Sequence, residues 1–196
     1  MVKMLKRWRR RARAAVLTAL GLVGGLIGGW AGGWWDVPWL NDLGILGGLG
    51  GNRTPQACIV TKVSDGDTLQ ARCTQGSRKP ALHKVRLRAI DAPELRQAYG
   101  QQARQALNRL CLGASFTLPP KPRTDQYGRL LLDLECGGVD VAQRMVGTGM
   151  AWVYHHEAQR YPALVALQAQ ARRSGKGLWG QAKPQEPWLW RKQHAR

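Results

Sequence analysis

The sequence predicts a mixed α+β fold that is mainly β, in which five short strands form a small barrel accompanied by about three α-helices. The strands are indicated by short runs of alternating apolar and polar residues, as at Val85, Leu87 and Ala89, which is the period of a half-buried strand. The helices are indicated by apolar residues that recur at intervals of three and four, as at Ala103 and Leu107. At 196 residues, the chain is long enough for one such domain with extensions.

Three segments precede the predicted domain. Residues 1–13 form a basic head with seven lysines and arginines, and residues 14–35 contain no charged residue. That uncharged length spans a bilayer, and its positive flank predicts that the head stays in the cytoplasm while the rest of the chain lies on the far side. We interpret residues 14–35 as an uncleaved membrane anchor; a cleaved signal peptide, which would give a secreted protein, is the alternative. Residues 36–56 form a glycine-rich linker.

Glycines recur at every fourth position of the uncharged segment, at Gly21, Gly25, Gly29 and Gly33. In lipid, such a row gives a flat face on which two helices approach closely, so helix-mediated self-association is a hypothesis for this segment. Small residues also occur in monomeric membrane spans, which is the alternative.

The folded domain is predicted to occupy residues 57–180, with strands at 58–63, 68–73, 81–90, 115–118 and 130–135. Asp65-Gly66 is a strong signal for a two-residue hairpin turn between the first two strands. The third strand is expected to end before Pro93, because proline cannot donate to a strand ladder and favours extended geometry in the residue before it.

Helices are predicted at residues 95–112, from Asp140 to about 147 or 149, and at residues 161–173. Asp140 is expected to cap the second helix, since its side chain can accept from a free N–H of the first turn. Five short strands with helices inserted and appended are typical of the oligonucleotide-binding (OB) barrel. Residues 181–196 form a basic, tryptophan-containing tail, in which Arg191 and Lys192 are either contacts for a nucleic-acid backbone or a frayed cationic end.

The four cysteines, Cys58, Cys73, Cys111 and Cys136, lack the close pairs that zinc sites favour. They predict two disulfides if the domain lies outside the cytoplasm; four buried free thiols are the alternative. A two-residue turn at Asp65-Gly66 places Cys58 opposite Cys73, although as a hydrogen-bonded pair, in which the Cα atoms lie farther apart unless a bulge intervenes. Cys111 with Cys136 follows by elimination.

The charge balance predicts a polyanionic partner. Lysine and arginine number 30, against 12 aspartates and glutamates. Such an excess favours nucleic acid or an anionic membrane surface. A feature that serves solubility alone is the alternative.

Carboxylates and arginines gather at the predicted strand ends. Asp67 and Asp91 could give hard oxygen ligands to one divalent cation, and calcium suits such a set because it accepts carboxylates, carbonyls and waters in flexible geometry. Glu94 could accept a proton from a water that attacks phosphorus. Arg86 and Arg129 could neutralise the phosphodiester as negative charge develops. The alternative for these residues is an ordinary strand end with solvated ion pairs.

Three motifs in order, VSDGDT at 63–68, VRLRAIDAPE at 85–94 and TDQYGR at 124–129, resemble the staphylococcal nuclease (thermonuclease) family. The resemblance covers about residues 57–180. It implies a five-stranded barrel with three helices and a calcium-dependent phosphodiesterase that acts on DNA and RNA.

The resemblance also implies roles for single residues. Asp67, Asp91 and the backbone carbonyl of Ala92 would bind calcium, Glu94 would be the general base, Arg86 and Arg129 would bind phosphate, and Tyr127 would contact the nucleotide. The chain departs from the family at Gln126, where a nucleotide-contacting lysine is expected, and at His155 and Glu157, where base-stacking tyrosines are expected. Tyr154 or His155 is the expected substitute, since stacking needs a flat ring.

The sequence therefore predicts a membrane-tethered or exported endonuclease of low sequence specificity, with the nuclease domain outside the cytoplasm. A non-catalytic nucleic-acid-binding barrel on a membrane anchor is the alternative, and the intact set of two arginines and three carboxylates argues against it. A structural membrane protein whose glycine-rich segment is the functional part is a third interpretation.

Overall fold

The computed structural model describes residues 55–76 and 79–195. The chain divides into two units, Met1–Gly51 and Asn52–Arg196, and the description here concerns the second. The predicted basic head, membrane anchor or signal segment, its glycine row and residues 36–54 of the linker all lie outside the described residues. Within residues 55–76 and 79–195, no helix has the length and apolar character needed to cross a membrane.

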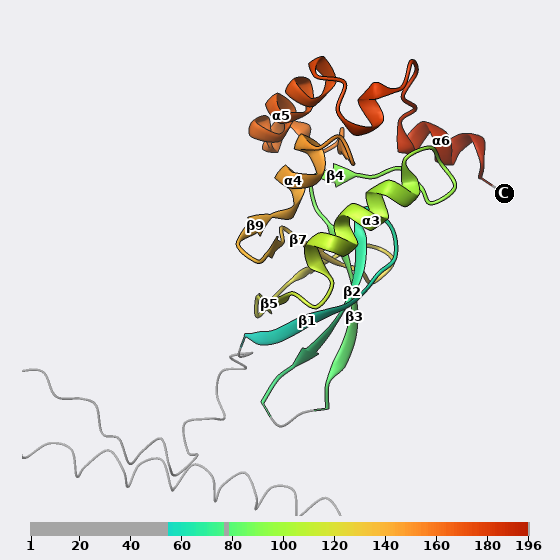
Figure 1. The fold of residues 1–196 in the computed structure, drawn as a ribbon. Helices are drawn as coiled ribbons and strands as arrows, with labels where there is room; N and C mark the ends of the chain where they lie inside the picture. Colours follow the sequence, from blue (N-terminus) through green and yellow to red (C-terminus); the bar gives the residue numbers. More distant parts are fainter. Residues whose placement is uncertain (1–54, 77–78, 196) are drawn as a thin grey trace, which may run out of the picture. The chain divides into compact units, whose positions relative to one another are not determined.

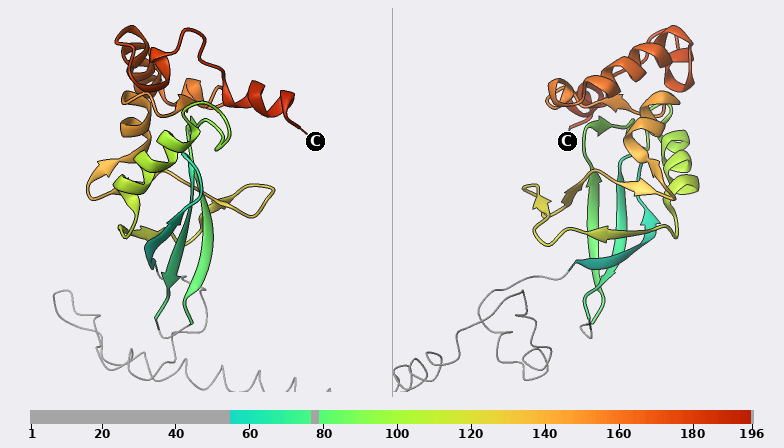
Figure 2. Two further views of the ribbon diagram at one scale, coloured as in Figure 1. Left: turned by 45° about the vertical axis from the view of Figure 1, so that its right-hand side comes forward. Right: turned by 90° about the vertical axis from the view of Figure 1, so that its left-hand side faces the viewer.

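The main sheet is a curled half-barrel of six strands in the order β5-β1-β2-β3-β7-β6. The strands are β1 (Gln56–Val63), β2 (Thr68–Thr74), β3 (Ala81–Leu87), β5 (Ser115–Leu118), β6 (Arg123–Thr124) and β7 (Leu130–Leu132). All neighbours are antiparallel except β3 and β7. Figures 1 and 2 show the long strands curling together, with the helices gathered toward one end. The predicted mixed α+β class is confirmed. The predicted five-stranded barrel differs from the observed sheet, which has six strands and in which no ladder joins the edge strands β5 and β6 among the described strands.

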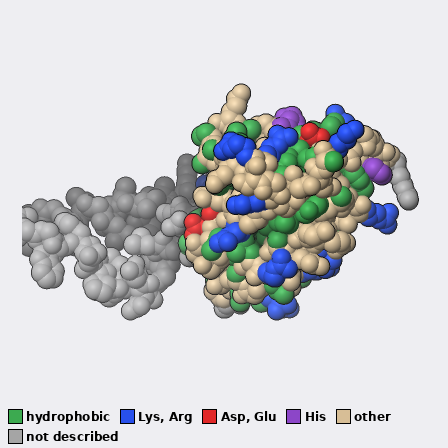
Figure 3. Space-filling view, turned by 45° about the horizontal axis from the view of Figure 1, so that its top comes forward, with side chains coloured by type: hydrophobic (Ala, Val, Ile, Leu, Met, Phe, Trp, Pro, Cys, Tyr) green, Lys and Arg blue, Asp and Glu red, His purple; other side chains and the backbone are tan. Residues whose placement is uncertain are grey.

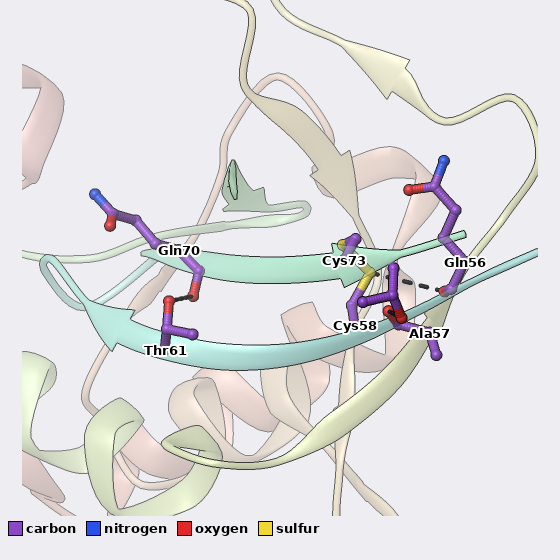
Figure 4. Close-up of a disulfide and its surroundings, with 7 residues drawn as sticks. Gln56, Ala57, Cys58, Thr61, Gln70 and Cys73 are labelled. Carbon is purple, nitrogen blue, oxygen red and sulfur yellow. Dashed lines mark hydrogen bonds between the residues drawn. A yellow bond between two sulfur atoms is a disulfide. The ribbon is translucent and has the colours of Figure 1, made fainter. Parts of the chain in front are cut away.

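The hairpin of β1 and β2 corrects the predicted turn. Ser64 N–H donates to the Thr68 carbonyl at 2.9 Å, so three residues rather than two form the turn. A bulge between Val60 and Lys62 absorbs the extra residue, and Cys58 still lies opposite Cys73, with the Cα atoms 4.0 Å apart. Figure 4 shows the resulting disulfide and the nearby hydrogen bond from Thr61 Oγ1 to the Gln70 carbonyl, at 3.3 Å.

The second predicted disulfide, Cys111–Cys136, is also present. It ties the last residue of α3 (Gly100–Cys111) to β8 (Glu135–Cys136), which pairs with β9 (Val139–Asp140). No free cysteine is found in the described part, so the alternative of four free thiols is wrong for this structure.

Two predicted strands are each divided. The strand expected at residues 81–90 ends at Leu87, because Ala89 adopts a left-handed backbone (φ 63°), and the chain restarts as β4 (Ile90–Asp91) beside β10 (Trp152–Val153). The strand expected at residues 130–135 is divided between β7 and β8.

The helices match the prediction except at the start of the first one. α3 begins at Gly100 rather than residue 95, while α4 (Val141–Gly147) is capped by Asp140 as predicted, and α5 is Pro162–Arg173. Two 3₁₀ turns, η1 (Ala158–Arg160) and η2 (Gly177–Gly180), and the short helix α6 (Pro187–Gln193) were not predicted.

The main core fills the space between the sheet and the helices α3 and α4. Its fully buried side chains include Leu69, Val85, Leu107 and Met145. A smaller cluster of Trp152, Ala171, Leu178 and Trp179 supports the last part of the chain, where Trp188 of α6 packs against it. The tail is therefore a docked element and not a frayed end.

Candidate active site

A cleft of about 720 Å³ lies where β2 begins and β3 ends. Eight of the nine residues predicted for catalysis, metal binding or substrate contact line it: Asp67, Arg86, Asp91, Ala92, Glu94, Tyr127, Arg129 and Tyr154. These residues come from separate chain segments, as the three motifs predicted. A larger hollow of about 930 Å³ beside β5 has none of the eight among its lining residues, so the functional groups favour the smaller cleft.

Arg86 bridges the two predicted metal ligands. Its Nε lies 3.2 Å from Asp67 Oδ1, and its Nη2 lies 3.5 Å from Asp91 Oδ1. Its Nη1 donates to the carbonyls of Leu87 and Ile90, the latter at 2.8 Å. Because one guanidinium contacts both aspartates, the two carboxylates face a common point. In this structure, most of the hydrogen-bonding capacity of Arg86 is used within the protein.

Asp67 is held against Ala92, near the end of the second motif. Its Oδ2 accepts from Ala92 N–H at 2.8 Å, and its Oδ1 accepts from Thr68 Oγ1 at 3.0 Å. The turn can approach this closely because Gly66 has no side chain: a Cβ there would lie 2.5 Å from Cβ of Ala92 and 2.7 Å from Cβ of Ala103. Because Gly66 has no side chain, the hairpin turn packs directly against Ala92, a predicted metal ligand, and against Ala103 of α3.

The carboxylates differ in burial, and their pKa values reflect it. Asp91 is fully buried, and that desolvation raises its pKa, although Arg191 and Arg86 oppose the shift. Burial, followed by repulsion from Asp67, raises the pKa of Asp65 to about 6. Negative charge that is concentrated in a desolvated site is stabilised by nearby cations. Arg86 and Arg191 already compensate part of the charge of Asp67 and Asp91.

Arg191 of α6 is a cleft residue that the sequence did not place there. Its Nη2 lies 2.7 Å from Asp91 Oδ2, and its Nη1 lies 3.1 Å from Asp91 Oδ1 and 2.9 Å from Glu94 Oε1. Its hydrogen bonds to Asp91, more than the opposing desolvation, raise the pKa of its guanidinium. The basic character of residues 181–196 suggested either contacts with a nucleic-acid backbone or a frayed end for Arg191, and it did not predict a contact with Asp91 or Glu94.

Arg129 lies at the cleft with its charged end available. Asp125 Oδ2 accepts from Arg129 Nε at 2.7 Å, and Asp125 Oδ1 accepts from the backbone N–H groups of Tyr127 and Arg129, both at 2.9 Å. Burial opposes the charge on Asp125, but these hydrogen bonds outweigh it and lower its pKa. Within the described residues, neither Nη atom of Arg129 makes a hydrogen bond, so both remain available as donors to an anion.

The aromatic candidates divide into two groups. Tyr127 is 74% exposed and Tyr154 is half-buried, and both line the cleft. The ring of His155 instead packs 4.7 Å from Trp188 and 3.8 Å from His156, and His155 is not among the residues that line the cleft. Of the two expected substitutes, only Tyr154 therefore lines the cleft.

Glu157, at an expected base-stacking position, has a structural contact instead. Its Oε2 accepts from Ala89 N–H at 2.9 Å, and its Oε1 lies 3.4 Å from Arg88 Nη2. Arg88 also pairs with Asp133 at 2.8 Å. These contacts hold the left-handed turn at Ala89 that precedes β4, and so help to place Asp91.

The donor set fits a hard cation. Two buried carboxylates, Asp67 and Asp91, lie beside Ala92, and carboxylate and carbonyl oxygens are the ligands that calcium prefers. No cluster of three or more histidine, cysteine, aspartate or glutamate side chains suited to a metal occurs among the described residues. A cation here would therefore need carbonyl or water oxygens to complete its coordination.

Basic side chains are frequent on the surface of the described part. Figure 3 shows lysine and arginine side chains spread over the visible face of the described part, with few acidic ones. The whole chain carries a formal net charge of +18. Such a field attracts a polyanion.

Comparison with known proteins finds relatives that are described as nucleases. A family profile described as "Staphylococcal nuclease homologue" matches residues 84–181. The chain is 40% identical over 133 residues to an "Uncharacterized endonuclease" of Escherichia coli O157:H7, a match that covers 67% of this chain and 82% of that protein. It is 37% identical over 142 residues to an "Uncharacterized endonuclease" of Haemophilus influenzae, which covers 72% of this chain and 76% of that protein.

A plant relative matches over a shorter length. The "Probable staphylococcal-like nuclease CAN1" of rice (Oryza sativa subsp. japonica) is 41% identical over 110 residues, which is 56% of this chain and 33% of that protein. The chain thus spans about a third of the rice protein and most of each bacterial one.

Proposed function

We propose, because this chain belongs to the family of staphylococcal nuclease homologues, that it is a calcium-dependent phosphodiesterase that hydrolyses DNA, RNA or both with low sequence specificity. The observation that carries the proposal is the bridge from Arg86 to Asp67 and Asp91 in a cleft that Glu94 and Arg129 also line. A carboxylate pair, a third carboxylate and arginines around one cleft match the needs of phosphodiester hydrolysis.

Asp67, Asp91 and the Ala92 carbonyl would hold the calcium ion. When bound, calcium supplies positive charge that stabilises the phosphodiester oxygens as negative charge builds on them. Asp67 and Asp91 are buried and tied to neighbouring groups, so their oxygens are preorganised.

Glu94 would accept the proton of the attacking water, since it is a partly exposed carboxylate that lines the cleft beside the proposed metal ligands. Arg129 would donate both free Nη groups to a phosphate, and a planar fork suits two phosphate oxygens. Arg86 has less donor capacity left for the same group, because Nη1 donates to two carbonyls and Nη2 donates to Asp91.

Substrate contacts of this kind carry little base information. Arginine–phosphate contacts read the backbone, and stacking on Tyr127 or Tyr154 tolerates any base because every base has a flat face. Low sequence specificity follows from this set of contacts.

The nuclease domain would lie outside the cytoplasm, tethered through residues 14–35 or released if that segment is cleaved, with self-association through the glycine row when it is retained. The two disulfides support an oxidising compartment. Membrane fractionation with protease protection tests this location. We expect external protease to digest the domain in intact spheroplasts, and a domain that stays protected would instead lie in the cytoplasm.

The activity is tested with the full-length chain in neutral detergent, incubated with supercoiled plasmid or single-stranded RNA in calcium chloride or in a calcium chelator. Cleavage that needs calcium supports the proposal. Asp91→Asn is the matched control, because it removes one charge from the cleft and should abolish cleavage. Binding to nucleic acid without cleavage in calcium would instead favour the non-catalytic module.

A further inference from the structure

The C-terminal helix α6 places a cation on the carboxylates that are proposed to bind calcium. Arg191 contacts both oxygens of Asp91, at 2.7 and 3.1 Å, and one oxygen of Glu94, at 2.9 Å. Asp91 has no exposed surface, so its charge has no access to water in this structure. A buried carboxylate without a counter-charge is costly, and Arg191 removes much of that cost.

Arg191 is held there by contacts that fix the chain before α6 and the first turn of the helix. Gln97, itself buried, accepts from Glu94 N–H at 3.1 Å and donates to the Gln185 carbonyl at 2.7 Å, which fixes the chain just before α6. Pro187 is buried, and the ring of Trp188 packs edge-on against Trp152 at 5.7 Å. A tail that only carried charge would need none of these anchors.

We propose that Arg191 is an internal competitor of the divalent cation: it occupies the Asp91 and Glu94 carboxylates in the metal-free protein and sets the calcium concentration at which the site fills. The inference rests on the proposed function, since it assumes that Asp91 is a calcium ligand. A dication at Asp91 must take oxygens that now accept from Arg191, so binding includes the cost of breaking or rearranging these charge-assisted hydrogen bonds.

The consequence is measurable without any assay of catalysis. Replacing Arg191 by glutamine removes the competitor, so calcium should bind about tenfold more tightly, the value of one charge-assisted hydrogen bond at a partly exposed site. The same variant leaves Asp91 with only the longer contact to Arg86 as counter-charge in the absence of metal, so its metal-free melting temperature should fall by about 3 °C or more. Saturating calcium should remove most of that difference.

Lys192→Gln is the matched control, because it lies on the same helix, removes the same charge and makes no ion pair within the described residues. Trp188→Ala is a second probe: it weakens the docking of α6 without changing any charge, and should also tighten calcium binding. Arg191→Lys, which keeps the charge but loses the planar fork, should fall between wild type and Arg191→Gln.

The experiment is isothermal titration of full-length protein with calcium chloride in neutral detergent, together with thermal unfolding with and without calcium. Tighter binding by Arg191→Gln than by Lys192→Gln, with a lower metal-free melting temperature, supports the inference. Equal or weaker binding by Arg191→Gln, in a wild type that does bind calcium, overturns the inference alone. Failure of both proteins to bind calcium overturns the calcium site and the inference together.

Discussion

Asp125 holds Arg129 through Nε: its Oδ2 accepts from Arg129 Nε at 2.7 Å, while neither Nη atom of the arginine makes a hydrogen bond inside the described domain. The same aspartate accepts from two backbone N–H groups of the TDQYGR turn, so turn and arginine are fixed as one unit. The pairing explains how a half-buried arginine can present its phosphate-binding edge in a fixed direction.

This arrangement makes Asp125 a positioning residue for Arg129. We expect Arg129→Ala to lower kcat/KM on plasmid DNA by at least about 100-fold, and Asp125→Asn by about tenfold, since the latter leaves the arginine present but less well oriented. The double variant should be no slower than Arg129→Ala alone. Additive losses in this double-mutant cycle would show that Asp125 acts independently of Arg129.

Glu94 is the proposed proton acceptor. We expect Glu94→Gln to reduce kcat by at least about 100-fold, because the amide keeps the shape of the side chain but cannot accept the proton. Its effect on folding should be small, since the carboxylate is partly exposed and its structural contact is to Arg191. Single-turnover cleavage measures the rate, and thermal unfolding checks the fold; a rate near that of the wild type would remove Glu94 from the mechanism.

Gly66 lets the turn at residues 65–67 pack closely against Ala92 and Ala103. We expect Gly66→Ala to destabilise the domain by about 1–3 kcal/mol and to weaken cleavage, because the new methyl group must push Asp67 away from Ala92 or shift α3. Gly147→Ala is the matched control: its Cβ would meet only Leu167 Cδ2, at 3.9 Å, so it should fold and cleave like wild type. Chemical denaturation and plasmid cleavage measure both effects, and equal behaviour of the two variants would contradict this role.

The sequence predicted the convergence of the motif residues because each motif is local and ends a strand. Asp67 and Asp91 lie at strand ends, and a half-buried strand period is readable from neighbouring residues. The division of the third strand was not readable in this way. It depends on Ala89 adopting φ 63°, a conformation that Ala disfavours and that Glu157, 68 residues later, supports.

Arg191 was missed for the same reason. Its contact with Asp91 spans 100 residues and depends on the docking of a seven-residue helix, which carries little local signal. The Cys58–Cys73 pair was correct although the turn was wrong, because the bulge after Val60 offset the longer turn. Local patterns therefore predicted most of the longer strands and helices and the gathering of the motif residues at one cleft, while contacts between residues far apart in the chain, such as Arg191 with Asp91, needed the structure.

The two disulfides should account for a large part of the stability of the domain. They close loops with sequence separations of 15 and 25 residues, and restricting the unfolded chain to loops of that size is worth about 3 kcal/mol each. We expect dithiothreitol to lower the melting temperature of the calcium-free protein by more than about 5 °C. Thiol titration of unfolded protein without reductant should give no free thiol; four titrated thiols, with a melting temperature unaffected by reductant, would contradict both the pairing and the oxidising compartment that it supports.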